Sequence, residues 1–246
     1  MRVNRFLHRS SLVALLAFLA TSAQLFGADH HTSKFSFNGK DVAVDTYDAQ
    51  AASDDAQGKP GAIVLLHGAS GPDLPTYREQ ADFFATRGFT VFVLHYFDAT
   101  KSAQTSPQNY AVWANLVDAY VRQLIADPTT KTDNVFLLGY SLGASVALAA
   151  GSQGTPATAI AEWYGSLPDE FFYKFKTMPP LLILHGQRDN NIPVSNAQQL
   201  IQLCGMKQLT CESHIYEGEG HGFAGSALAD ANSRTLAFLA KHQPAK

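Results

Sequence analysis

The chain has 246 residues, of which 46% are apolar and 16% charged, and its formal net charge is −3. An apolar content of this size excludes an intrinsically disordered chain, and the composition shows no collagen-like or coiled-coil bias. Only 18 residues are Lys or Arg, and they form no basic run, so neither nucleic acid nor an anionic membrane surface is expected as a partner. The length suits one globular domain with a sizeable core.

The first residues have the pattern of a secretory leader. Three arginines within the first nine residues precede an apolar run over 12–20, and small residues follow. The run is shorter than the roughly 20 apolar residues that span a bilayer, so stable membrane insertion is not expected. We predict a signal peptide over residues 1–27 and a folded domain over 28–246, placed in a periplasm or outside the cell. The cleavage site stays open between Ala23 and Ala28.

The segment after the leader predicts an antiparallel start. Alternating stretches at 34–37 and 41–47 are joined by Asn38-Gly39, the strongest short-range signal of a β-hairpin. A small, polar loop over 51–59 follows. Ala62–Leu66 is then apolar throughout, as expected of a strand that is covered on both faces.

Strands and helices alternate through the rest of the chain. Further strands are predicted over 89–95, 135–138, 159–164, 181–184 and 214–216, and helices over 76–88, 108–126, 142–150, 195–205 and 226–241. Thr76 with Glu79, and Ser195 with Gln198, predict side-chain caps for two of these helices. A hairpin followed by repeated strand and helix predicts an α/β fold: a mainly parallel, eight-stranded sheet with helices on both faces and no large cap domain.

Three residues that follow predicted strands form a candidate catalytic set, because ligands bind beyond the carboxyl ends of parallel strands. Ser141 lies in Gly139-Tyr-Ser-Leu-Gly143 between a strand and a helix, which is the setting of a nucleophile elbow. Asp189 follows the strand over 181–184, and His221 follows the last strand. Ser, Asp, His is the chain order of an α/β-hydrolase triad. We predict Ser141 as nucleophile, His221 as general base and Asp189 as the residue that orients the imidazole.

Other roles for these residue types stay open. Asp189 is also placed to cap a turn, in which case Asp98 is the substitute acid. His67, His95 and His185 also lie at strand ends, but they lack helical ligand spacing and an acidic cluster. We therefore predict neither a metal nor another cofactor.

Acyl transfer also needs backbone donors for the oxygen that becomes negative in the transition state. One donor is predicted to be the amide of Leu142, directly after the nucleophile. The second is expected from the glycine-rich loop after Leu66, where Ala69 is the first choice and Gly68 the alternative.

Cys204 and Cys211 are the only cysteines of the chain. They lie near a helix end and at the start of the next strand, and an oxidising compartment allows a disulfide between them. Two free thiols are the alternative.

Several of these segments together resemble the dienelactone hydrolase family over about residues 60–240. They are Gly139-Tyr-Ser-Leu-Gly143, His185-Gly-Gln-Arg-Asp189 and Gly220-His-Gly-Phe223, with Tyr77-Arg78 and Tyr164-Gly165. The resemblance implies the α/β-hydrolase fold and hydrolysis of carboxylic esters. Dienelactone hydrolase proper uses a cysteine nucleophile and a nearby glutamate, where this chain has Ser141 and Gly68. The chain is therefore expected to be closer in chemistry to general serine esterases.

The length of one connection bears on the substrate. Lids are commonly inserted between the strands over 159–164 and 181–184, and only about sixteen residues lie there, so an open site for a small ester is expected. Trp163, Tyr164 and Phe172 are candidates for a pocket wall, and the alternative is that these aromatic side chains pack the segment onto the sheet.

We expect a monomeric or small homo-oligomeric serine esterase. The alternatives are a peptidase or thioesterase with the same triad, a binding protein that kept the fold without the chemistry, and a metal-dependent hydrolase.

Overall fold

The computed structural model describes residues 30–50, 61–130 and 134–243. The predicted signal peptide and its cleavage site lie outside these ranges and stay predictions, as does the predicted loop over 51–59. Among the helices that are described, none is long and apolar enough to cross a membrane.

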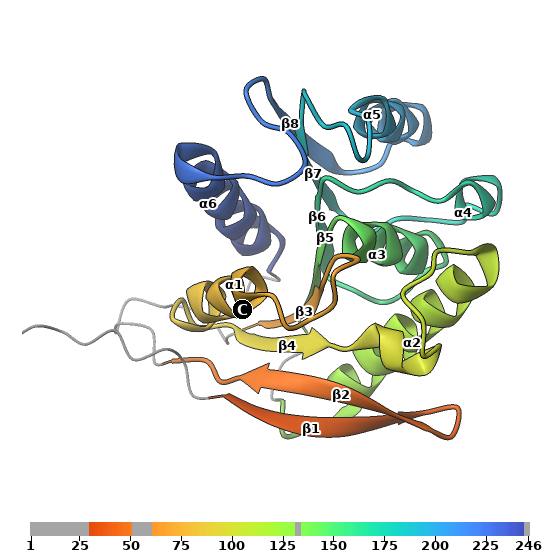
Figure 1. Ribbon diagram of the computed structural model, residues 1–246, viewed down its shortest axis with the longest axis vertical. Coiled ribbons are helices and arrows are strands. Elements are labelled where there is room, and N and C mark those ends of the chain that lie inside the picture. Colours follow the sequence, from red (N-terminus) through yellow and green to blue (C-terminus); the bar gives the residue numbers. More distant parts are fainter. Residues whose placement is uncertain (1–29, 51–60, 131–133, 244–246) are drawn as a thin grey trace, which may run out of the picture.

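The described strands form one eight-stranded sheet with the order β1-β2-β4-β3-β5-β6-β7-β8 (Figure 1). The strands are β1 (His30–Phe37), β2 (Lys40–Tyr47), β3 (Ala62–Leu66), β4 (Thr90–Leu94), β5 (Val135–Tyr140), β6 (Ala159–Trp163), β7 (Leu181–Gly186) and β8 (Cys211–Tyr216). The pairs β1·β2 and β2·β4 are antiparallel, and all other neighbours are parallel. The predicted fold class and the N-terminal hairpin are thereby confirmed.

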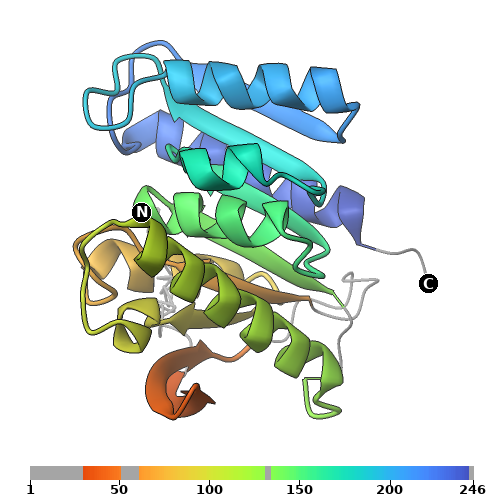
Figure 2. The same cartoon turned by 90° about the vertical axis from the view of Figure 1, so that its right-hand side faces the viewer.

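Helices cover both faces of the sheet. They are α1 (Pro75–Ala85), α2 (Pro107–Ala126), α3 (Leu142–Ser152), α4 (Asp169–Tyr173), α5 (Ser195–Lys207) and α6 (Gly225–His242), with a 3₁₀ turn at Tyr96–Ala99. In Figure 1, α1 and α6 lie on one face and α2, α3 and α5 on the other, and Figure 2 looks onto the second group. The connection between β6 and β7 holds only the five-residue α4, in agreement with the prediction of no large cap domain.

The core has two layers because successive side chains of a strand point to opposite faces. In β3, Val64 packs into the layer under α2, α3 and α5, whereas Ile63 and Leu65 pack into the layer under α1 and α6. All five residues of β3 are buried, so the unbroken apolar run seen in the sequence reflects cover on both faces.

Both predicted side-chain caps are wrong. Helix α1 begins at Pro75, with Leu74 at the N-cap position and no capping side chain. Proline suits the first helical position because its ring presets φ and its missing N–H has no acceptor there in any case. Helix α5 begins at Ser195 after Val194, again without a side-chain cap.

Several strands are longer than their sequence pattern indicated: β1 begins at His30, and β5 continues to Tyr140. β7 continues to Gly186 and β8 begins at Cys211, because the two strands pair in register from Leu181 with Cys211 to Gly186 with Tyr216. The short α4 and the 3₁₀ turn also carried no periodic signal.

A disulfide joins Cys204 of α5 to Cys211 of β8, with an S–S distance of 2.07 Å. The disulfide crosslinks α5 to β8, the strand that follows it in the chain and lies at one edge of the sheet. Neither sulfur is therefore available as a nucleophile in this state.

Candidate active site

Ser141 occupies a single-residue turn between β5 and α3. Its backbone has φ 54° and ψ −119°, a conformation that is rare for any residue with a side chain. The flanking glycines make the turn feasible: a Cβ at Gly139 would lie 2.5 Å from Cα of Ala144, and one at Gly143 would overlap the carbonyl of Leu66. The turn therefore has the geometry of the predicted nucleophile elbow.

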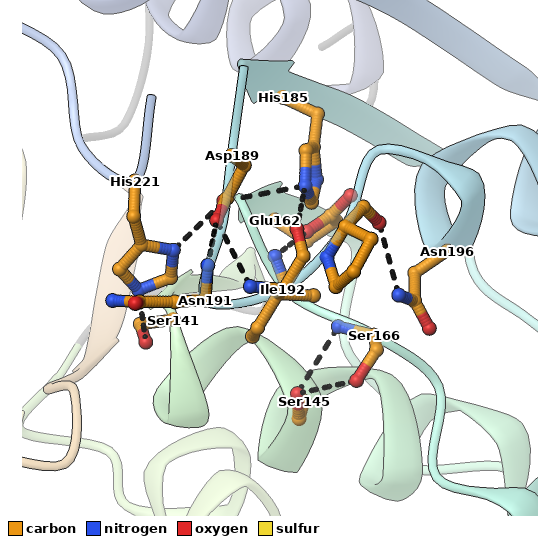
Figure 3. A network of polar contacts seen from close by, with 12 residues as sticks. Ser141, Ser145, Glu162, Ser166, His185, Asp189, Asn191, Ile192, Asn196 and His221 are labelled. Atoms are coloured by element: carbon orange, nitrogen blue, oxygen red, sulfur yellow. Dashed lines mark hydrogen bonds and ion pairs between the residues drawn. The ribbon is translucent and has the colours of Figure 1, made fainter. Parts of the chain in front are cut away.

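The structure brings the three predicted triad residues together (Figure 3). Oγ of Ser141 lies 2.8 Å from Nε2 of His221, and Nδ1 of His221 lies 2.8 Å from Oδ2 of Asp189. These residues come from the ends of β5, β8 and β7, so the carboxyl edge of the sheet collects them. With the proton of His221 on Nδ1, Nε2 is free to accept the hydrogen of the Ser141 hydroxyl.

The carboxylate of Asp189 is held from several sides. Its side chain is fully buried, and Oδ1 accepts hydrogen bonds from the amides of Asn191 at 2.8 Å and Ile192 at 2.9 Å. Oδ2 faces His221, and Nε2 of His185 is 3.4 Å away. Asp189 thus both caps the turn and contacts His221, so the two roles considered for it coexist.

Asp98, the substitute acid, lies elsewhere. Its carboxylate accepts a hydrogen bond from the amide of Ala43 and pairs with Lys101 at 3.4 Å. Its backbone belongs to the 3₁₀ turn after β4. Asp189, not Asp98, is the carboxylate in contact with His221.

The three other histidines at strand ends bind protein groups. Nδ1 of His67 contacts the carbonyl of Gly68 at 2.8 Å, and burial lowers the pKa of His67 to about 4. Nε2 of His185 donates to the carbonyl of Ile192, and burial lowers its pKa as well. Nε2 of His95 lies 2.8 Å from Oδ2 of Asp45. Within the described ranges, no group of three or more His, Cys, Asp or Glu residues is arranged to hold a metal ion.

Of the two predicted backbone donors, Leu142 directly follows Ser141, and Ala69 lies in the loop after β3. Leu142 is the first residue of α3, and amides of a first helical turn have no acceptor inside the helix. In the loop after β3, the amide of Gly68 donates to the hydroxyl of Tyr77 at 2.8 Å. The Gly68 amide thus already has an acceptor within the protein, which favours Ala69 of the two loop candidates. A Cβ at Gly68 would lie 3.4 Å from Cβ of Ser141, which shows how close this loop comes to the nucleophile.

An aromatic pair supports the imidazole of His221. The ring of Tyr164 lies edge-on to that of His221 with 5.0 Å between centroids, and the ring of Phe223 lies 5.1 Å from that of Tyr164. Tyr164 has φ 48°, a left-handed backbone that is uncommon outside glycine, asparagine and aspartate. Strained residues of this kind gather at functional sites, and here the conformation turns the ring toward His221.

The three predicted pocket residues separate in the structure. Tyr164 lies at the site, as described above. Trp163 is 1% exposed and donates from Nε1 to Oγ1 of Thr235, so its prediction as a pocket wall is wrong. Strand alternation turns Trp163 toward α6 and into the core. Phe172 lies on α4, is 41% exposed and packs against Tyr173, and no contact in the described part of the chain joins it to the triad.

Sequence reasoning did not assign Tyr77, Phe223 or Glu162 a place at the site. Tyr77 and Phe223 stand out in the sequence only as parts of family-like segments, because no local pattern indicates what an aromatic ring will contact. Glu162 had a visible signal, a lone acid in the otherwise apolar strand β6.

Glu162 is fully buried on β6, beside the turn that follows the strand. Oε2 accepts a hydrogen bond from the amide of Gly165 at 2.8 Å, and Oε1 has no partner among the described residues. Burial raises the pKa of Glu162 to about 8, against a smaller opposing effect of the Gly165 amide. The side chain is therefore a neutral carboxylic acid at neutral pH.

Glu162→Gln is expected to stabilise the protein increasingly as the pH rises from about 4.5 to about 8. In this window the folded protein keeps a proton that the unfolded chain releases, so wild-type stability falls with rising pH. Glutamine keeps an oxygen for the Gly165 amide and does not titrate. The difference in unfolding free energy between Glu162→Gln and the wild type should grow by up to about 1.4 kcal/mol per pH unit.

Urea unfolding at pH 5, 6, 7 and 8 measures this gap. Glu79→Gln, at an exposed position of α1, is the matched control and should leave the pH dependence unchanged. A difference between wild type and Glu162→Gln that is constant over this range would contradict the prediction.

Comparison with known proteins identifies a family and a fold. The family model described as the Dienelactone hydrolase family matches residues 44–242. A comparison with curated proteins finds no match.

Solved structures show the same fold. A dienelactone hydrolase-like promiscuous phosphotriesterase from metagenomic libraries has a TM-score of 0.71 at 15% identity, covering 88% of this chain and 99% of its own. Dienelactone hydrolase from Anabaena variabilis has a TM-score of 0.69 at 16% identity, over 87% of this chain and 99% of its own. An esterase from Thermogutta terrifontis with bound propionate has a TM-score of 0.66 at 18% identity, covering 87% of this chain and 94% of its own. At such identities the likeness establishes the fold alone.

Proposed function

The chain belongs to the dienelactone hydrolase family, and on this premise we propose that it hydrolyses carboxylic esters with Ser141 as nucleophile. The family and the fold make it a hydrolase of the α/β-hydrolase type. The finer assignment rests on one observation, the continuous chain of two 2.8 Å contacts from Ser141 through His221 to Asp189.

The proposed reaction has two half-reactions. Oγ of Ser141 attacks the ester carbonyl while Nε2 of His221 takes the hydroxyl proton, which forms a tetrahedral intermediate. The intermediate collapses as His221 passes this proton to the departing alcohol, and an acyl-enzyme remains. A water molecule then attacks the acyl group in the same way, and the acid and free Ser141 are released.

The surrounding groups supply what each step requires. Asp189 holds the imidazole in the tautomer with hydrogen on Nδ1 and stabilises the imidazolium that forms. The amides of Ala69 and Leu142 are the proposed donors to the oxyanion, each worth roughly 3 kcal/mol in the transition state. The positive end of the α3 dipole at Leu142 adds to this stabilisation.

We favour ester substrates with a small acyl group. The connection between β6 and β7 contributes only the five-residue α4, so little chain is available to enclose a long substrate. The esterase from Thermogutta terrifontis, which has the same fold, was solved with propionate, a three-carbon acid. We propose short-chain esters as substrates for this chain.

We also propose that the protein acts after export to a periplasm or the medium. The leader-like residues 1–27 suggest this destination, and the disulfide between Cys204 and Cys211 supports it, since such bonds persist in oxidising compartments.

Labelling with a fluorophosphonate tests the proposed nucleophile, because this probe phosphonylates a serine only when a base activates it. The wild type is expected to be labelled at once and Ser141→Ala not at all. Ser145→Ala is the matched control, since Ser145 lies one turn further along α3 and binds Ser166 instead of His221, and it should be labelled like the wild type. An unlabelled wild type, or a labelled Ser141→Ala, would defeat the proposal.

Matched substrates then distinguish esterase from peptidase and thioesterase. A butyrate ester, anilide and thioester are compared at equal concentration, and the ester should give the highest kcat/KM. Faster cleavage of the anilide or thioester would replace the ester assignment while leaving the triad in place.

A further inference from the structure

We propose that the Tyr77 hydroxyl is a third donor to the oxyanion, beside the amides of Ala69 and Leu142. This inference rests on the proposed function and adds a catalytic side chain to it. Tyr77 is the third residue of α1, and it reaches the site across the loop that follows β3.

The first argument is position. The amide of Gly68 donates to Oη of Tyr77 at 2.8 Å. A Cβ built on Gly68 would lie 2.7 Å from that Oη and 3.4 Å from Cβ of Ser141. The phenol oxygen and the Ser141 side chain therefore both lie close to the side of Gly68 from which a Cβ would project.

The second argument is hydrogen-bond accounting. Oη of Tyr77 accepts one hydrogen bond, from Gly68, and within the described ranges no acceptor takes its own hydrogen. Burial raises the pKa of Tyr77, so the hydroxyl keeps this hydrogen at neutral pH. A phenol that already accepts a hydrogen bond is polarised into a better donor.

The third argument is rigidity, because a donor stabilises a transition state most when it is already in place. The ring of Tyr77 is buried between two other rings. Its centroid lies 6.3 Å from that of His67 and 5.7 Å from that of Tyr140. The backbone of Tyr77 belongs to helix α1. The hydroxyl needs no rearrangement to meet a substrate oxygen.

Tyr96, in the 3₁₀ turn after β4, provides a comparison because its hydroxyl contacts the same loop. Its hydroxyl donates to the carbonyl of His67 at 2.8 Å, one residue before Gly68, and its side chain is fully buried. Tyr96 thus holds the loop in place, while its hydrogen is used within the protein. Loss of either hydroxyl removes one restraint on the loop, but only Tyr77 has a hydrogen to give to substrate.

The experiment compares Tyr77→Phe with Tyr96→Phe in hydrolysis of p-nitrophenyl butyrate. For Tyr77→Phe we expect kcat to fall about 10-fold to 100-fold with KM within about twofold, because the donor acts on charge that forms only in the transition state. Binding of a boronic acid that mimics the tetrahedral intermediate should weaken by a similar factor. For Tyr96→Phe we expect both quantities within about twofold of wild type, with a lower Tm.

Equal losses in the two variants, or an unchanged kcat in Tyr77→Phe, would show that Tyr77 only restrains the loop. A change in KM alone would also overturn the inference. If Tyr77→Phe does not fold, Gly68→Ala serves instead, since its Cβ would push the hydroxyl away, and an unaltered kcat there counts against the proposal.

Failure of the proposed function gives a different result. In that case the wild type itself neither hydrolyses the ester nor reacts with fluorophosphonate, and both proposals fall together. An active wild type with a fully active Tyr77→Phe overturns only the role of Tyr77.

Discussion

Ser141→Ala and His221→Ala are each expected to lower kcat for p-nitrophenyl butyrate by about 10⁵-fold to 10⁶-fold. Alanine at 141 removes the hydroxyl oxygen that the structure places 2.8 Å from Nε2 of His221. Alanine at 221 leaves the hydroxyl protonated and too weakly nucleophilic to attack an ester. KM should change little, since neither side chain contributes much to ground-state binding.

The double variant is the sharper measurement. If the two residues act as one unit, Ser141→Ala with His221→Ala is no slower than either single variant, because the second change removes a group that already has no function. Measurement of kcat for all three variants, with Ser145→Ala as the active control, gives the comparison. Losses that multiply in the double variant would show that the two side chains act independently.

Asp189→Asn is expected to lower kcat about 10⁴-fold while the fold stays intact. The two backbone amides of Asn191 and Ile192 donate to Oδ1, so the amide oxygen of an asparagine must take that place. Its NH₂ group then occupies the position of Oδ2 and points at Nδ1 of His221. Nδ1 is thereby forced to accept, the ring hydrogen moves to Nε2, and Nε2 no longer takes the proton of Ser141.

Steady-state kinetics at pH 7 to 8 with thermal unfolding of the same samples measures this effect. Asp98→Asn is the matched control, because Asp98 binds Ala43 and Lys101 and not His221, and it should retain wild-type kcat. The prediction fails if Asp189→Asn keeps more than about a tenth of the activity, or if Asp98→Asn shows the larger loss.

The fold was largely predictable because its signals are local. Asn38-Gly39 indicated the hairpin that pairs β1 with β2, and the apolar run of β3 indicated a strand buried on both faces. The wrong caps at Thr76 and Ser195 show the limit of such signals. A Ser or Thr near a helix start is one of several ways to begin a helix, and at α1 the neighbouring Pro75 determined the first residue instead.

The sequence predicted which residues form the candidate site better than it predicted what their side chains contact. Ser141, Asp189 and His221 each follow a strand, and parallel strands end at one edge, so their meeting followed from topology. Trp163 shows why side-chain surroundings did not follow. It is adjacent to Tyr164 in the chain, yet one ring lies in the core with Thr235 and the other against His221.

The sequence by itself determined the order of the elements, the strained Gly-flanked serine and the chain order of the three polar residues, since these depend on neighbours within a few positions. Only the tertiary structure decided that Asp189 instead of Asp98 contacts His221, that the Gly68 amide donates to Tyr77, and that Tyr77 and Ser141 both lie against Gly68. Each of these joins segments far apart in the chain, and their separation depends on strand register and helix packing. No local pattern carries that information.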